Sequence, residues 1–404
     1  MARKMKDSGI EWIGEIPEGW EVVPVKRLCT MQAGKNLTSE QIAPEGTYPV
    51  YGGNGIRGFF SDYNCDGQFL TVGRQGALCG NVHKINGKVW ATEHAVITTP
   101  SSYTILDFLY FLLIGMDLNQ YVSSTAAQPG LAVGTLLNLK TCYPCSTLEQ
   151  TQISNYLNAK CSEIDIMLSK TRSSIEEYKK LKQAVITQAV TKGVRGERKM
   201  KDSGVEWIGT YPSNWKIIKI KWLLHERKDR SVTGLEEPLS MSQKKGLIPT
   251  KDMDSIPNMA SSFIGAKLVY KGDLVFNKLK AHLGVFSVSK YNGLVSPDYA
   301  VYYSTGPANL NFLELLFKTP QYINEFKKKS SGVGAGLTRL YTGDLYSIYC
   351  ALPPLVEQEE IADYLDIKCT EIDRLIAKKE QLVKELESYK KSLIYEVVTG
   401  KREV

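Results

Sequence analysis

The segment from Leu148 to Thr191 occurs twice in this chain, and its second copy lies 208 positions later, at the C-terminal end. The shift pairs Glu149-Gln150 with Glu357-Gln358 and Thr191 with Thr399, and no residue is inserted or deleted between these points. A repeat of this length and regularity predicts the same local structure for both copies. The chain must therefore bury the same apolar surface twice.

Each copy has the pattern of one long amphipathic helix. Apolar residues recur at gaps of three, four and seven, which places them on one stripe, while charged residues such as Lys170, Glu176 and Lys180 fill the other face. The stripe of the first copy comprises Leu157, Ile164, Leu168, Ile175, Tyr178, Leu181, Val185 and Ala189. Pro144 before the segment and Gly193 after it delimit a helix about 60 Å long.

Neither helix can bury this stripe alone, so the simplest arrangement packs the two helices on each other as an antiparallel coiled coil. The residues expected to pack this helix pair are Leu157, Ile164, Leu168, Ile175, Leu365, Ile372, Ile376 and Val383. Two unrelated core helices are the alternative, and the unbroken register of the repeat disfavours it.

The composition bounds the class of protein. At 404 residues with 43% hydrophobic content, the chain can form two or three domains, and its net charge of +7 is modest. Eight cysteines without a signal peptide indicate reduced thiols in a cytoplasmic protein. The longest apolar run, Ile105 to Met116, contains Asp107 and is too short to span a bilayer, so no membrane segment is expected.

A second, shorter repeat opens each half of the chain. Residues 6–14 return as residues 201–209 with one substitution, a shift of 195, and Trp20 returns as Trp215. Because the helical segments are offset by 208, the region between the two repeated elements is 13 residues longer in the second half. The variable regions show no comparable identity to each other. The predicted parts are a first domain at 1–147, a central helix at 148–195, a second domain at 196–354 and a C-terminal helix at 355–404.

Three separate elements now resemble one known family. The phrase from Asp7 to Trp20, the helical opening from Glu357 to Ala362 and the closing Val397-Val398-Thr399-Gly400 are similar to the DNA-specificity (S) subunit of type I restriction-modification systems. The similarity covers essentially the whole chain. It implies an α+β protein in which two α/β target-recognition domains are separated by the two long helices, with an internal pseudo-twofold repeat.

The resemblance also implies a function without catalytic residues in this chain. Each recognition domain would read one half of a bipartite site in double-stranded DNA, and the helices would dock two methyltransferase (M) subunits and set the spacing of the half-sites. Motor-nuclease (R) subunits would join through the M subunits. S-adenosylmethionine, ATP and Mg²⁺ are expected on these partner subunits, and no cofactor is expected on this chain.

The first variable region, about Glu21 to Thr147, is rich in glycine, aromatic and β-branched residues and predicts many short strands. Its two glycine-dense loops present side chains suited to DNA, since arginine pairs with guanine, asparagine or glutamine pairs with adenine, and all can hold a phosphate. The candidate DNA contacts are Asn54, Arg57, Arg74 and Gln75, and plain hairpin turns are the alternative. Residues 107–121 are predicted to form one helix.

Charge separates the two variable regions. Between Glu21 and Thr147 eight Lys/Arg balance eight Asp/Glu, whereas between Lys216 and Leu355 the count is nineteen against eleven, a net of +8. The second region should therefore neutralise most of the DNA phosphate charge. Alternation from Asp273 to Lys280 predicts a strand with its lysines and the following histidine on one face. The candidate DNA contacts are Lys244, Lys245, Lys278, Lys280, His282 and Arg339, and solvated surface charge is the alternative for each.

Several enzymatic signatures are absent from the sequence. The only Pro-Pro pair, Pro353-Pro354, lies between leucines and does not form an adenine-methyltransferase tetrapeptide, and no Gly-Lys pair is followed by Ser or Thr as a P-loop requires. Pro297-Asp298 with Glu325 imitates a nuclease pattern, but Glu325 follows Pro320 in a predicted helix instead of a strand. No catalytic residue is therefore predicted.

Metal and nucleotide sites are not predicted either. Cys142-x-x-Cys145 lacks a second pair, and the four histidines form no zinc set, so structural thiols are the preferred interpretation. Ser331 to Gly336 is glycine-rich without the strand, helix and acid of a dinucleotide fold, which favours a loop. The repeated tryptophans, Trp12 with Trp207 and Trp20 with Trp215, are either interface aromatics or core anchors. Lys327 to Lys329 is predicted to lie at a helix end.

Overall fold

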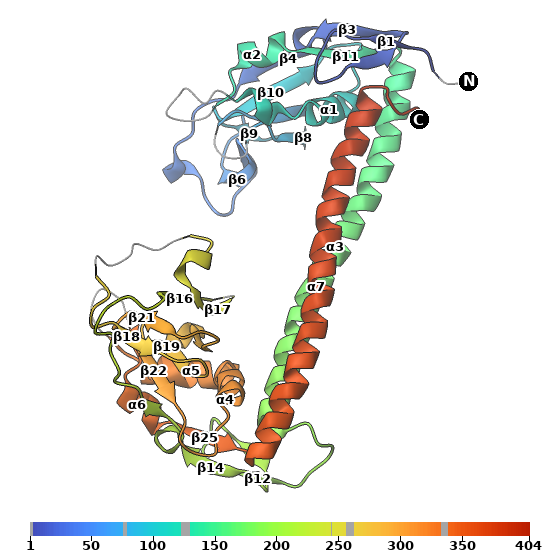
Figure 1. Cartoon of the computed structure of the whole chain (residues 1–404). Coiled ribbons are helices and arrows are strands. Elements are labelled where there is room, and N and C mark those ends of the chain that lie inside the picture. Colours follow the sequence, from blue (N-terminus) through green and yellow to red (C-terminus); the bar gives the residue numbers. More distant parts are fainter. Residues whose placement is uncertain (1–2, 76–78, 123–129, 244, 256–261, 333–337) are drawn as a thin grey trace. The chain divides into compact units, whose positions relative to one another are not determined.

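The computed structural model of the chain describes residues 3–75, 79–122, 130–243, 245–255, 262–332 and 338–404 (Figure 1). Its two longest helices are α3, Thr147–Lys192, and α7, Leu355–Val398, and each begins and ends within one residue of its copy of the repeated segment. The predicted helical parts, 148–195 and 355–404, extend past the observed C-terminal ends. Gly193 and Gly400 follow them with φ of +81° and +71°. This left-handed conformation, which glycine adopts without strain, ends each helix.

The chain divides into two compact units. Unit 1 contains Met1–Ser173 and Glu380–Val404, and unit 2 contains Ser174–Lys379. Each unit therefore combines one variable region with one part of α3 and one part of α7. None of the helices in the described residues has both the length and the apolar content needed to cross a membrane.

Unit 1 is an α+β domain around a four-stranded antiparallel sheet of order β4-β10-β7-β8. A smaller sheet of order β6-β5-β9 and the strand pairs β1-β2 and β11-β3 accompany it. The elements of unit 1 besides α3 and α7 are β1 (Met5–Asp7), β2 (Glu15–Pro17), β3 (Trp20–Pro24), β4 (Cys29–Ala33), β5 (Tyr48–Gly52), β6 (Gly55–Phe60), β7 (Gln68–Gly73), β8 (Val82–Asn86), β9 (Trp90–Ala91), β10 (Ala95–Pro100), α1 (Leu106–Gly115), α2 (Val133–Asn138) and β11 (Lys140–Pro144).

Unit 2 repeats this plan. Its central antiparallel sheet has the order β15-β22-β19-β20, and the pairs β12-β13 and β14-β25 correspond to β1-β2 and β3-β11. The elements of unit 2 besides α3 and α7 are β12 (Met200–Asp202), β13 (Thr210–Pro212), β14 (Lys216–Lys219), β15 (His225–Glu226), β16 (Leu239–Ser242), β17 (Gly246–Pro249), β18 (Lys267–Val269), β19 (Leu274–Asn277), β20 (Phe286–Val288), β21 (Gly293–Val295), β22 (Tyr299–Tyr303), α4 (Leu310–Phe317), α5 (Pro320–Lys329), β23 (Ser331–Gly332), β24 (Thr338–Arg339), α6 (Thr342–Ser347) and β25 (Tyr349–Leu352).

The repeated framework segments pack on the helices in the core of each unit. In unit 1, Trp20 is buried in one cluster with Leu157 of α3 and Val398 of α7. In unit 2, Trp215 is buried with Val190 of α3 and Leu365 of α7. Each such apolar side chain contributes about 1.5–3 kcal/mol when fully buried. Both tryptophans are thus core anchors, the second of the two alternatives that the sequence left open.

A buried glutamine joins each helix to its variable region. Gln150 donates to the carbonyls of Pro144 and Tyr103 and accepts from the N–H of Ile105 at 2.8 Å. Its 208-residue counterpart, Gln358, makes the same three bonds to Pro353, Pro307 and Asn309 in unit 2. The two repeated helices are therefore joined to their variable regions by equivalent bonds.

A carboxylate beside each glutamine holds the framework segment. Glu149 accepts from Arg3 and from the indole N–H of Trp20 at 3.1 Å, and its counterpart Glu357 accepts from Arg198. Among the described residues the indole nitrogen of Trp215 has no such partner, and Asn214 donates to Glu357 instead. Both repeats thus keep the glutamate as acceptor, and one of its donors differs: Trp20 in the first repeat and Asn214 in the second.

Ion pairs join α3 and α7 in both units and show that the helices run antiparallel. In unit 1 Asp165 pairs with Lys390 at 2.7 Å, and in unit 2 Lys182 pairs with Asp373 at 2.6 Å. Asp373 and Lys390 are the 208-residue counterparts of Asp165 and Lys182, so the two bridges are equivalent. In unit 1 the partner on α7 changes from Lys390 to Glu387 as the residue on α3 changes from Asp165 to Arg172, so the partner number falls as the residue number rises.

The expected packing residues differ in how deeply they are buried. Leu157, Ile164, Leu168, Ile175, Leu365 and Ile372 are buried, whereas Ile376 and Val383 are half-buried. Leu181, which the periodicity assigns to the stripe, is 48% exposed, so that assignment is wrong. Its neighbour Lys182 donates to Asp373 of α7 and is the residue that contacts the other helix here.

The single helix predicted over residues 107–121 is also wrong. The structure has α1 from Leu106 to Gly115 and a separate 3-10 turn over Leu118–Tyr121. Asp117 between them has φ of +44°, a left-handed conformation that aspartate tolerates better than most residues and that ends the α-helix.

Candidate nucleic-acid interface

The two glycine-dense loops of unit 1 lie against each other. A Cβ on Gly73 would stand 1.9 Å from the carbonyl oxygen of Gly53, and a Cβ on Gly53 would stand 2.8 Å from that of Gln75. Only glycine permits this approach of one backbone to the other. The glycines thus bring the β5–β6 hairpin onto the end of β7, and two loops that are separate in sequence form one edge.

The predicted contacts of unit 1 lie on this edge in different environments. Asn54 is exposed in the two-residue turn of the hairpin, and its Oδ1 accepts from Asn81 Nδ2 at 2.8 Å. Arg57 is exposed on β6. Arg74 is half-buried directly after β7, and Gln75 forms a single β-bridge with Gly130.

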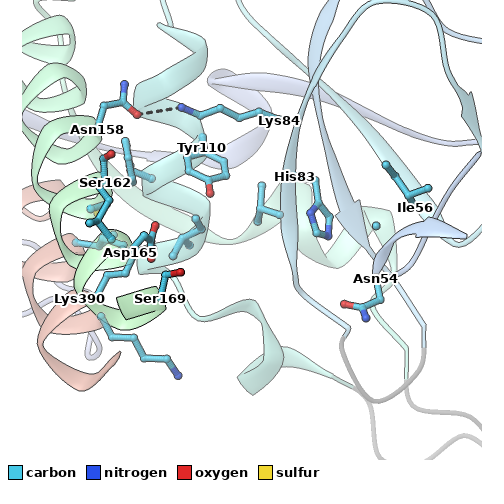
Figure 2. A pocket seen from close by; sticks show the side chains of 18 of the residues that line it. Asn54, Ile56, His83, Lys84, Tyr110, Asn158, Ser162, Asp165, Ser169 and Lys390 are labelled. Atoms are coloured by element: carbon cyan, nitrogen blue, oxygen red, sulfur yellow. Dashed lines mark hydrogen bonds and ion pairs between the residues drawn. The ribbon is translucent and has the colours of Figure 1, made fainter. Parts of the chain in front are cut away.

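A cavity of about 970 Å³ lies between this hairpin and the helices of unit 1 (Figure 2). Asn54 and His83 line one side of it, and Asn158 and Asp165 of α3 line the other. Burial lowers the pKa of His83, so its imidazole is neutral near pH 7. Asp165 is already paired with Lys390, so its charge is compensated within the protein.

Lys84 lines the cavity and is held by two polar side chains. Its Nζ lies 2.8 Å from Asp107 of α1 and 3.2 Å from Asn158 of α3. Burial acts to raise the pKa of Asp107, but the hydrogen bonds from Lys84 and Asn158 outweigh it and lower that pKa. Lys84 therefore fixes the variable region to α3 and is not a free cation for DNA.

In unit 2 the predicted strand is shorter than the alternation indicated. β19 ends at Asn277, because the Asn277 side chain accepts from the N–H of Leu279 and turns the chain. Lys278 and Lys280 lie in this turn and His282 in a following 3-10 turn, so the expectation that all three share a strand face is wrong.

The remaining cations of unit 2 lie in several places. Lys245 is half-exposed and pairs with Asp254 at 2.6 Å, while Lys244 lies outside the described residues. Lys280 is exposed, and His282 is half-buried with no hydrogen-bond partner at Nδ1 in the described part of the chain. Arg339 of β24 pairs with Asp298 and lies near Lys278.

Arg74 and Lys278 occupy the same position in their units. The sheet register places Ala95 opposite Gly73 in unit 1 and Tyr299 opposite Asn277 in unit 2. Tyr299 lies 204 positions after Ala95, and Asn277 lies 204 positions after Gly73. The carbonyl of Arg74 accepts from Leu131 at 2.8 Å, as the carbonyl of Lys278 accepts from Leu340 at 3.0 Å. Two regions without recognisable sequence identity thus place a cation at the same sheet edge.

The folded structure disfavours the charged form of Lys278. Burial lowers the pKa of Lys278, and the nearby Lys267 and Arg339 lower it further, while Glu226 and Asp298 act in the opposite direction. Lys267 is itself nearly buried and pairs with Glu226 at 3.1 Å. A cluster of cations that repel one another is suited to an anionic partner.

The structure also places the nuclease-like pattern and the lysine run that the sequence contains. Glu325 lies in α5, as predicted, and not on a strand beside Asp298. Lys327 to Lys329 form the last turn of α5, also as predicted. The glycine run at 333–336 lies outside the described residues.

The thiols proposed as structural differ in their surroundings. Cys142 is buried, and burial raises its pKa to about 12, whereas Cys145 is exposed. Both are free thiols. No group of three or more potential metal-ligating side chains occurs within the described residues.

Several polar residues at these edges were not singled out from the sequence: Asn81, His83, Glu93, His94 and, as a DNA contact, Asp298. Their only signal is that Glu93-His94 and Pro297-Asp298 directly precede β10 and β22. That signal becomes visible once the strands are placed.

The match to a known protein family lies in the first half of the chain. Residues 17–177 match the type I restriction modification DNA specificity domain. The first half of the chain is thus similar to this DNA-specificity family. A relative, the type I restriction enzyme EcoprrI specificity subunit of Escherichia coli, is 45% identical over 121 residues, which is 29% of this chain and 30% of that protein. The putative type I restriction enzyme MjaX specificity subunit of Methanocaldococcus jannaschii is 25% identical and covers 96% of this chain and 95% of its own length.

Solved structures share the fold. One, described as the structural basis underlying complex assembly and conformational transition of the type I R-M system, has a TM-score of 0.69 at 14% identity and covers 96% of this chain and 99% of its own. The HsdS subunit from Thermoanaerobacter tengcongensis has a TM-score of 0.51 at 15% identity and covers 98% of this chain and all of its own. The likeness to these two structures therefore concerns the whole fold.

Proposed function

We propose that this chain is the specificity subunit of a type I restriction-modification complex and that it catalyses no reaction itself. The observation that carries the proposal is the cation at the same sheet edge of both units, Arg74 in unit 1 and Lys278 in unit 2. The scaffold is repeated while the side chains around the cation differ. Such an arrangement suits a protein in which each unit reads a different half of one bipartite DNA site.

The unequal charge of the variable regions assigns different tasks to the units. Unit 2 carries most of the excess of lysine and arginine, a net of +8 between Lys216 and Leu355, and supplies most phosphate contacts. Unit 1 has a neutral variable region. It reads bases through the hairpin that bears Asn54 and Arg57 and through Arg74 and Gln75, with few phosphate contacts.

In this proposal α3 and α7 form an antiparallel coiled coil that sets the distance between the half-sites. The equivalent ion pairs Asp165–Lys390 and Lys182–Asp373 support it. An insertion that lengthens the two helices must lie where the units divide, after Ser173 in α3 and after Lys379 in α7. An insertion near the end of α3 is unsuitable because Ala189 and Val190 already belong to the core of unit 2. Four residues inserted at both points add about 6 Å of helix, close to two base pairs.

The partners follow from the proposal. Two M subunits, which bring S-adenosylmethionine, dock on the helices, and R subunits, which bring ATP and Mg²⁺, join through them. Exposed apolar side chains on the helices, among them Met167 at 52%, Ile367 at 59% and Tyr389 at 50%, support a docking surface there. Double-stranded DNA is the substrate of the assembly, which places the complex in the cytoplasm.

Methylome mapping tests the proposed function. A host strain in which the gene for this chain is deleted, and the same strain after complementation, are compared by single-molecule sequencing. The complemented strain should methylate adenines in a motif of two asymmetric parts at fixed spacing, and the deletion strain should not. The purified chain alone should transfer no methyl group. A motif that persists after deletion, or methyl transfer by the isolated chain, would contradict the proposal.

A further inference from the structure

The sheet edge that bears the cation also bears a polar residue directly before the neighbouring strand. His94 precedes β10 in unit 1, and Asp298 precedes β22 in unit 2. The register of the central sheets, with Ala95 opposite Gly73 and Tyr299 opposite Asn277, makes these two residues equivalent. Their side chains differ in chemistry, although the scaffold around them is the same.

In unit 1 several side-chain polar atoms at this edge have no hydrogen-bond partner among the described residues. The N–H of Arg74 donates to the carbonyl of His94 at 3.0 Å, which fixes the two turns together. His94 Nε2 lies 3.1 Å from Glu93 Oε1. His94 Nδ1, Glu93 Oε2 and Arg74 Nε are buried with no hydrogen bond in the described residues. Such atoms destabilise a fold, so their concentration at one edge indicates a polar ligand.

In unit 2 the corresponding edge holds a guanidinium in a fixed position. Asp298 pairs with Nη2 of Arg339, while Nε of Arg339 is buried without a partner in the described part of the chain. The ring of Tyr341 lies 5.9 Å from the guanidinium carbon. The Asp298 side chain is 66% exposed and that of Arg339 is 23% exposed, so the pair stands at the surface with the carboxylate outermost.

We infer that Asp298 is a specificity-determining positioning residue, which orients Arg339 toward a guanine in the half-site of unit 2. His94, at the equivalent place in unit 1, holds the turn of Arg74 through its backbone carbonyl and presents its imidazole to the other half-site. The inference rests on the proposed function. Guanine presents O6 and N7 in the major groove, and a guanidinium matches both acceptors only when its plane is held in place.

The chemistry of the two residues explains why the same position gives two specificities. A carboxylate such as Asp298 fixes an arginine by accepting hydrogen bonds, and its other oxygen can accept from an amino group of the adjacent base. An imidazole such as that of His94 has two ring nitrogens for hydrogen bonds, and Glu93 engages one of them. The base next to the guanine should therefore differ between the half-sites.

The test uses the full complex, with methylome mapping and with competition binding to duplexes that differ at single base pairs. Asp298→Asn should lower the discrimination for guanine at one position of one half-site by about tenfold or more, the size expected of a bidentate contact. Arg339→Lys should relax the same position, and Asp298→Glu, which keeps the carboxylate, should retain the motif. His94→Asn should relax one position in the other half-site.

The matched control is Asp373→Asn. It makes the same chemical change at an ion-paired carboxylate of similar exposure, 57% against 66%, on α7 of unit 2. It should leave both half-sites unchanged. If Asp298→Asn fails to assemble, Arg339→Lys keeps its charge and carries the same test.

The outcomes separate this inference from the proposed function. If the wild-type complex methylates a split motif but Asp298→Asn and Arg339→Lys leave every base position unchanged, the inference is overturned and the function stands. The inference is also overturned if these variants relax different positions, or if His94→Asn acts on the same half-site. A wild-type complex that methylates no split motif overturns the proposed function itself.

Discussion

Replacing Gln150 or Gln358 with alanine should loosen one unit and spare the other. Each glutamine is fully buried and makes three hydrogen bonds that tie the first turn of its helix to the variable region. Alanine leaves a buried N–H without its acceptor, which costs about 1–3 kcal/mol, and two carbonyls without one donor each, which add roughly 1 kcal/mol. We expect a loss of about 2–4 kcal/mol per variant.

For a unit of this size the loss corresponds to a fall in Tm of roughly 4–16 °C. Hydrogen exchange of the full chain, read by mass spectrometry during urea unfolding, locates it. Gln150→Ala should expose the segment from Tyr103 to Ile105, and Gln358→Ala should expose the segment from Pro307 to Asn309. The structural reason is that each glutamine is the acceptor for the backbone N–H at the end of that segment.

The control is Gln381→Ala, which removes an exposed glutamine of α7 that donates to Glu385 at 3.0 Å. Its stability should stay within about 0.5 kcal/mol of wild type. If Gln150→Ala and Gln358→Ala behave like this control, or if either loosens both units equally, the glutamines do not link helix to domain as described.

Three further predictions concern single side chains. Lys278→Met should weaken DNA binding without lowering Tm at pH 7, because the folded state lowers the pKa of Lys278 and so disfavours its charged form. Any gain in stability over the wild type should shrink as the pH rises toward the unfolded pKa near 10.5 and vanish above it. A clear loss of Tm at pH 7 would refute this prediction. A thiol reagent at pH 8 should modify Cys145 in the native chain and Cys142 only after unfolding, and equal rates measured by mass spectrometry would show that Cys142 is not held in the core. Asp165→Lys should cost at most about 1 kcal/mol in urea unfolding, and adding Lys390→Asp should restore most of it; no recovery in the double variant would mean that the ion pair does not join the helices.

Much of the architecture could be predicted because local patterns determine it. The stripe from Leu157 to Ala189, bounded by Pro144 and Gly193, defines the helix to within one residue. The repeats of Trp20 and of Gln150 likewise predict two equivalent frameworks, since each copy must make the same core contacts. Periodicity failed where a neighbouring contact overrode it, as at the exposed Leu181.

The site could be predicted only in part because antiparallel pairing is a long-range property. Arg74 and Lys278 are each recognisable as loop cations, but their equivalence depends on the register of β7 with β10 and of β19 with β22, which no local pattern contains. The strand predicted through Lys280 ended early because one side chain, Asn277, accepts a backbone hydrogen bond. His94 and Asp298 carry no motif and become candidates only through their place at the strand ends.

The most direct test of the central claim, that each unit reads one half-site by itself, is an exchange of Lys216 to Leu355 for the equivalent region of another specificity subunit, followed by methylome mapping. The exchanged segment is bounded by β14 and the start of α7, so the framework, Gln150 and Gln358 are retained. We expect a new sequence in one half-site, with the other half-site and the spacer unchanged. A change in both half-sites, or in neither while methylation continues, would contradict it.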